Sequence, residues 1–130
     1  MREPKFRYGT KEAIEKLARE LELPYNDYMQ DWSYEVANPE DIEKYIKHYD
    51  LTSDEDEKFV LMEIIIQAVN DQADQKDFLK YWDRISGSLK EDFRIHEYTV
   101  FYWSRLDSES PDEEFTISPN MRGIWSHLTM

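Results

Sequence analysis

Residues 55–70 constrain the fold more than any other part of the chain. On a helical wheel their apolar side chains cover most of the circumference and leave a narrow polar ribbon of Asp56, Glu63, Gln67 and Asn70. A helix that is apolar on nearly every side must be enclosed by other elements. The sequence therefore predicts a central helix surrounded by the rest of the chain. We expect its polar ribbon to face solvent, with a polar groove along the helix as the alternative.

The remaining segments carry the helical periodicity that can supply this enclosure. Capping residues, or proline at the first helical position, mark the predicted helix starts: Thr10, Asn38 with Pro39, Thr52 with Glu55, and Ser118 with Pro119. Residues 25–36 and 77–93 also place large apolar side chains on one helical face. Four tryptophans each lie on the apolar face of their own predicted helix and are predicted to be largely buried: Trp32, Trp82, Trp103 and Trp125.

Residues 95–103 give a mixed signal. Their aromatic and β-branched side chains favour a strand, but the same residues keep a helical stripe. We predict a helix, with one short pair of strands from residues 95–103 and 115–117 as the alternative. The predicted fold is all-α, with about seven helices in an irregular bundle or a short stack of helical hairpins.

The length of 130 residues fits one domain with one core. We expect residues 1–9 to form a loosely ordered N-terminal segment of that domain. These residues lack the apolar run of a secretory signal, and no stretch of the chain approaches the roughly 20 apolar residues of a membrane span. The expected location is therefore the cytoplasm.

The charge balance restricts the partners. The chain has 29 acidic residues against 16 lysines and arginines, a net charge of −13. Such a field repels phosphate backbones and anionic headgroups. We expect no binding to nucleic acid or to membranes, and a basic protein is the partner that the charge favours.

No pattern in the sequence indicates catalysis, a cofactor or a metal. Without cysteine the chain has no disulfide, thiolate ligand or thiol nucleophile. Its histidines, His48, His96 and His127, lie on three separate predicted segments. His96 and Glu97 begin a zinc-protease pattern, but Val100 stands where the second histidine would be. The sequence predicts no cofactor, no metal site and no catalytic residue.

Two acidic clusters and one aromatic residue are the candidate partner-binding residues. One cluster is a polar loop with Asp107, Glu109, Asp112, Glu113 and Glu114. The other stands at the start of the central helix with Asp54, Asp56 and Glu57. Phe101 is the candidate aromatic anchor because it falls off the main apolar stripe of its segment. The alternatives are a solvated loop for the first cluster and stabilisation of a helix N-terminus for the second.

Four phrases resemble those of short, acidic, uncharacterised bacterial proteins: residues 30–37 (QDWSYEVA), 57–63 (EKFVLME), 95–104 (IHEYTVFYWS) and 121–125 (MRGIW). The resemblance implies no activity and no catalytic residue. In size, acidity and predicted helix content the chain is also similar to immunity proteins, which neutralise bacterial toxins.

The leading functional hypothesis is a non-enzymatic intracellular protein-binding module, and its sharpest form is an immunity-type inhibitor of a basic toxin. The alternative is a small enzyme or ligand sensor that uses carboxylates and His96 around an internal pocket. A third hypothesis, a homo-oligomer, requires an exposed apolar patch.

Overall fold

The computed structural model describes residues 3–106 and 114–129. Within these ranges the chain forms seven α-helices, one short 3₁₀ helix and no strand, which confirms the all-α prediction. Residues 95–103 are helical and residues 116–117 form a turn. In the same ranges no helix combines the length and the apolar character that crossing a membrane requires.

Contacts between residues divide the chain into two compact units. The first, Tyr8–Asp71, is called the N-terminal unit. The second joins Met1–Arg7 to Gln72–Met130 and is called the C-terminal unit. The expectation of a single domain stays a prediction, and each unit is described by itself.

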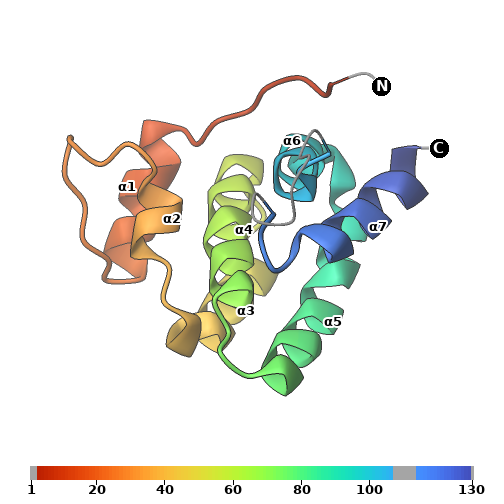
Figure 1. Cartoon of the computed structure of the whole chain (residues 1–130). Helices are drawn as coiled ribbons and strands as arrows, with labels where there is room; N and C mark the ends of the chain where they lie inside the picture. The colour runs from red at the N-terminus through yellow and green to blue at the C-terminus, as the bar shows by residue number, and fades with distance from the viewer. Residues whose placement is uncertain (1–2, 107–113, 130) are drawn as a thin grey trace. The chain divides into compact units, whose positions relative to one another are not determined.

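The N-terminal unit is built around α4. Its elements are α1 (Lys11–Glu20), α2 (Trp32–Val36), the 3₁₀ helix η1 (Pro39–Asp41), α3 (Ile42–Leu51) and α4 (Glu55–Asn70). All four other elements of the unit pack against α4 (Figure 1). Ten of the sixteen residues of α4 are buried, among them every aliphatic and aromatic side chain of the helix. Residues 55–70 therefore form a central helix, as their apolar circumference predicts.

Side-chain caps fix where the helices of this unit begin. Thr10 accepts a hydrogen bond from the backbone N–H of Ala13 at 3.2 Å, as predicted. The prediction that Thr52 caps α4 is wrong. Asp54 is the capping residue, and its carboxylate accepts from the backbone N–H of Glu57 at 2.9 Å. Thr52 instead closes α3, because its own N–H donates to the carbonyl of His48 at 3.1 Å.

The helix predicted over residues 25–36 is shortened to Trp32–Val36. The side chain of Asn26 accepts a hydrogen bond from the N–H of Tyr28 at 2.9 Å, and the N–H of Met29 donates to the carbonyl of Asn26 at 3.3 Å. Such local side-chain bonds offer the backbone an alternative to the helix. Tyr28 is 92% exposed, although the helical wheel placed it on a buried face.

The C-terminal unit contains α5 (Gln75–Glu91), α6 (Phe93–Ser104) and α7 (Ser118–Thr129). Helix α6 packs most extensively against α7, and α5 contacts both. Part of the N-terminal segment contributes to this unit. The ring of Phe6 meets that of Tyr98 edge to face with centroids 5.0 Å apart, and Arg7 donates to the carbonyl of Ile95 at 3.5 Å.

Three of the four tryptophans are almost completely buried. Trp32, Trp103 and Trp125 are at most 4% exposed. Trp82 is half-buried and therefore less enclosed than the other three. The buried stripe of α5 consists of Phe78, Ile85 and Leu89, and Trp82 lies at its edge.

Candidate functional site

The predicted partner-binding residues of the acidic loop lie mostly beyond the described chain: Asp107, Glu109, Asp112 and Glu113 fall outside residues 3–106 and 114–129. Glu114 is described, and its carboxylate pairs with the guanidinium of Arg122 at 2.9 Å. Phe101 is half-buried, and its ring centroid lies 5.3 Å from that of Trp125. Both residues therefore take part in contacts within the C-terminal unit.

The second predicted cluster belongs to the N-terminal unit, where two of its three acids contribute to the fold. Asp54 caps α4. Glu57 is only 6% exposed and accepts a hydrogen bond from the ammonium group of Lys16 at 3.1 Å. Asp56 is exposed. Most of this cluster thus follows its alternative interpretation, the stabilisation of a helix start.

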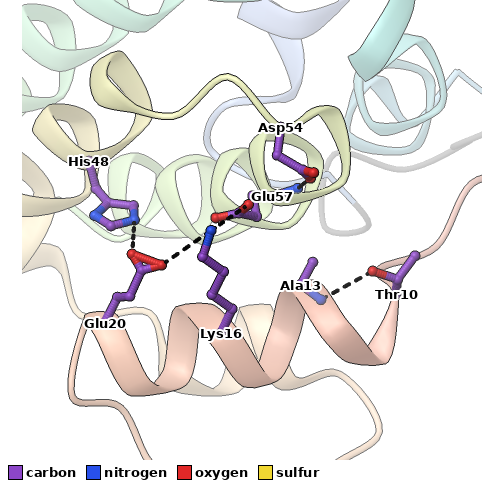
Figure 2. Close-up of polar contacts among 7 residues, drawn as sticks. All are labelled: Thr10, Ala13, Lys16, Glu20, His48, Asp54 and Glu57. Carbon is purple, nitrogen blue, oxygen red and sulfur yellow. Dashed lines mark hydrogen bonds and ion pairs between the residues drawn. The ribbon is translucent and has the colours of Figure 1, made fainter.

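Glu57 belongs to a polar cluster that the sequence did not reveal, shown in Figure 2. Besides its bond to Glu57, the Lys16 ammonium lies 3.8 Å from a carboxylate oxygen of Glu20. The other carboxylate oxygen of Glu20 lies 3.5 Å from Nε2 of His48. Three helices, α1, α3 and α4, contribute these side chains. We call Lys16, Glu20, His48 and Glu57 together the polar cluster.

The electrostatics of the polar cluster follow from the burial of Glu57. A buried carboxylate is costly unless it is paired and hydrogen-bonded. Lys16 supplies the positive charge, and the hydrogen bond and negative charge of Glu57 raise the pKa of the lysine above its usual value. Lys16 and Glu20 meet because residues four apart share one face of a helix.

Three groups of the polar cluster are potential metal ligands. Nε2 or Nδ1 of His48 and one carboxylate oxygen from each of Glu20 and Glu57 lie within 4.8 Å of one another. The sequence separates them by 28 and 9 residues on three helices, so no local spacing could reveal them.

Glu63 forms a second polar site on α4. The hydroxyl groups of Ser33 and Tyr34 donate to its two carboxylate oxygens at 3.0 and 3.1 Å. Burial raises the pKa of Glu63 from 4.5 to about 7, although both hydrogen bonds oppose the rise. The expectation that this position of the ribbon faces solvent is therefore wrong: Glu63 is half-buried and faces α2.

His96 does not line the hollow that lies beside α6 and α7 in the C-terminal unit. His96 is fully buried in α6. An open hollow of about 630 Å³ lies near the ends of α6 and α7, and it is lined by Glu3, Pro4, Lys5, Phe93, Glu97, Trp125, Leu128 and Thr129. This arrangement gives no support to the alternative hypothesis of a pocket built around His96.

The negative charge is concentrated in the N-terminal unit. Residues 8–71 contain 17 acids against 6 lysines and arginines, whereas residues 1–7 and 72–130 together contain 12 against 10. Within the N-terminal unit, residues 22–43 carry seven acids and no lysine, arginine or histidine. We call residues 22–43 the acidic segment. Six of its acids are exposed: Glu22, Asp27, Asp31, Glu35, Glu40 and Glu43.

Tyr28 stands within this acidic segment. It is the most exposed of the large hydrophobic side chains among the described residues, at 92%. The turn that presents it is held by Asn26, and beside it the hydroxyl of Tyr25 donates to the carboxylate of Asp27 at 3.4 Å. The absence of basic residues from the acidic segment was visible in the sequence, but the predicted helix placed Tyr28 in the core.

A comparison of the chain with protein-family models, curated proteins and solved structures finds no match.

Proposed function

We propose that this chain binds a basic protein through the acidic segment, with Tyr28 as the aromatic anchor. The observation that carries the proposal is the coincidence of charge and exposure in residues 22–43. Seven acids stand in this segment without one basic residue, and the same segment contains a tyrosine that is 92% exposed.

The two features support binding in different ways. Charges of one sign on a partner-facing surface raise the encounter rate with a partner of opposite sign. A large aromatic side chain that enters a pocket of the partner is a common source of binding energy, because truncating it costs about 2 kcal/mol or more. Tyr28 offers a phenol ring at little entropic cost, since only two side-chain torsions are fixed.

The sharpest form of the proposal is an immunity-type inhibitor of a basic toxin. A toxin that acts on nucleic acid must carry positive charge to hold its substrate. An acidic inhibitor would both associate rapidly and occupy that same surface. The enzyme or sensor alternative has less support, because His96 is fully buried and is not among the residues that line the hollow on the C-terminal unit.

In the experiment, partner proteins are captured from cell extract with the wild-type chain and, separately, with Tyr28→Ala. Only proteins that bind the wild type and fail to bind the variant are studied further. Association kinetics are then measured at two salt concentrations. The test variant combines Asp27→Asn, Glu40→Gln and Glu43→Gln. A matched control combines Asp83→Asn, Glu91→Gln and Glu97→Gln, which are exposed acids of the C-terminal unit and change the net charge equally.

We expect the on-rate to fall with salt and to fall further in the test variant than in the control. Tyr28→Ala should raise the off-rate by about thirtyfold, the equivalent of about 2 kcal/mol. Equal on-rates for the two triple variants would refute the acidic segment as the binding surface. A variant that neutralises Asp107, Glu109, Asp112, Glu113 and Glu114 tests the acidic loop in the same assay.

A further inference from the structure

The polar cluster brings together a donor set that suits a transition metal. One imidazole nitrogen from His48 and carboxylate oxygens from Glu20 and Glu57 lie within 4.8 Å of one another. Zinc binds histidine nitrogen and carboxylate oxygen at about 2.0–2.2 Å. We propose that Glu20, His48 and Glu57 form a binding site for a divalent transition metal of the zinc type, which displaces the ammonium group of Lys16.

The side chains have the freedom that this site requires. Ligands of a tetrahedral ion lie about 3.3–3.5 Å apart at these bond lengths, so the three groups must close by about an ångström. Glu57 is buried at the first turn of α4, where Asp54 holds its backbone N–H. Glu20 is exposed and His48 is half-buried, so both can move toward Glu57. A fourth position remains for water.

Lys16 distinguishes this cluster from a surface group of acids. Its ammonium lies 3.1 Å from Glu57 and 3.8 Å from Glu20, so the cluster already holds a positive charge between its carboxylates. The buried carboxylate of Glu57 needs such a charge. Lys16 is a long side chain that is 51% exposed, and it can leave for solvent when a divalent ion replaces it.

The donor set also predicts selectivity. A site with one imidazole nitrogen suits zinc, nickel or copper, whereas magnesium and calcium prefer oxygen ligands only. Affinity should follow the Irving–Williams order among the divalent ions of the first transition row. Magnesium and calcium at the same concentrations therefore serve as negative controls.

The test is a titration with zinc chloride against a chromophoric chelator, using the whole chain and three variants. His48→Gln removes a ligand at a half-buried position and should lower the affinity for zinc by about tenfold or more. Lys16→Met removes the competing cation and should raise the affinity by about tenfold. His127→Gln, at an exposed position on α7 of the C-terminal unit, is the matched control and should bind zinc like the wild type.

Thermal unfolding supplies a second readout. Lys16→Met leaves Glu57 without its cation, so we expect a lower Tm that zinc restores and magnesium does not. Equal zinc affinity in the wild type and in His48→Gln, or an equal loss in His127→Gln, would overturn the proposal. The same holds if neither the wild type nor Lys16→Met competes with the chelator for zinc. Tyr28→Ala should bind zinc normally, so this proposal and the proposed protein-binding function can fail separately.

Discussion

Glu63 gives the strongest test of the structure because its carboxyl is half-buried on α4 yet ionisable near neutral pH. Its pKa is raised by burial from 4.5 to about 7, while a nearby charge on Asp31 adds to the rise. In the unfolded chain the group returns to its ordinary value. The folded state therefore holds a proton more tightly than the unfolded state between pH 4.5 and 7.

The sign of the effect follows from that difference. The folded chain is most stable, with respect to this group, below pH 4.5, and it loses that contribution as the pH rises through 7. Each pKa unit is worth about 1.4 kcal/mol, so the shift corresponds to about 3 kcal/mol of folding stability. Glu63→Gln keeps the shape of the neutral acid and can still accept a hydrogen bond from Ser33 or Tyr34.

We expect Glu63→Gln to match the wild type at pH 4.5 and to be more stable by about 3 kcal/mol at pH 8. The assay is urea denaturation followed by circular dichroism at several pH values between these limits. The difference between the two proteins is the quantity compared, because other carboxyl groups titrate in both. Glu43→Gln, at an exposed position on α3, is the control and should change the free energy of unfolding by no more than about 0.5 kcal/mol at any pH.

A difference between Glu63→Gln and the wild type that stays constant with pH would refute the reasoning. It would mean that the carboxyl of Glu63 is hydrated and that α2 does not cover it. A variant that is less stable than the wild type at pH 8 would show that the hydrogen bonds from Ser33 and Tyr34 outweigh the cost of burying the charge.

Five further substitutions test three features of the local structure by denaturant titration. Asp54→Ala should cost about 1 kcal/mol because it removes the cap of α4, whereas Thr52→Ala should cost less than about 0.5 kcal/mol; a larger loss for Thr52 would restore the sequence-based capping prediction. Trp103→Ala should cost about 3–5 kcal/mol, and Trp82→Ala clearly less, because only the first side chain is fully buried; equal losses would contradict this. Glu22→Gly should raise the free energy of unfolding by about 1 kcal/mol, since Glu22 has a φ of 56°, and a loss would mean that this left-handed conformation is unstrained.

Sequence patterns correctly predicted those helices whose own apolar side chains determine which of their faces are buried. Residues 55–70 are apolar on nearly all sides, so their central position in the N-terminal unit did not depend on any partner segment. Residues 95–103 were ambiguous in propensity, but their helical stripe agreed with the structure. The segment is helical because its apolar stripe packs against α7, and this long-range packing overrides a modest local preference for strand.

The helix predicted over residues 25–36 was too long because local side-chain hydrogen bonds replace the backbone hydrogen bonds of a helix there. Residues 25–31 have helical periodicity, but the backbone N–H of Tyr28 donates a hydrogen bond to the side-chain oxygen of Asn26, and this turn takes the place of a helix. The indole of Trp32 then donates to the carbonyl of Pro24 at 2.7 Å and fixes the loop from its other end. Neither bond leaves a periodic signal in the sequence.

The acidic residues show why a dense group of acids in the sequence is a poor guide to where negative charge is available on the surface. Asp54 and Glu57 look like a docking cluster in the sequence, but the first caps a helix and the second is buried against Lys16. Acids that serve the fold in this way are not available to steer a partner. Those of residues 22–43 are mostly exposed, and no basic side chain of that segment neutralises them. A surface for a basic partner is therefore better sought where acids lack nearby bases than where acids are densest.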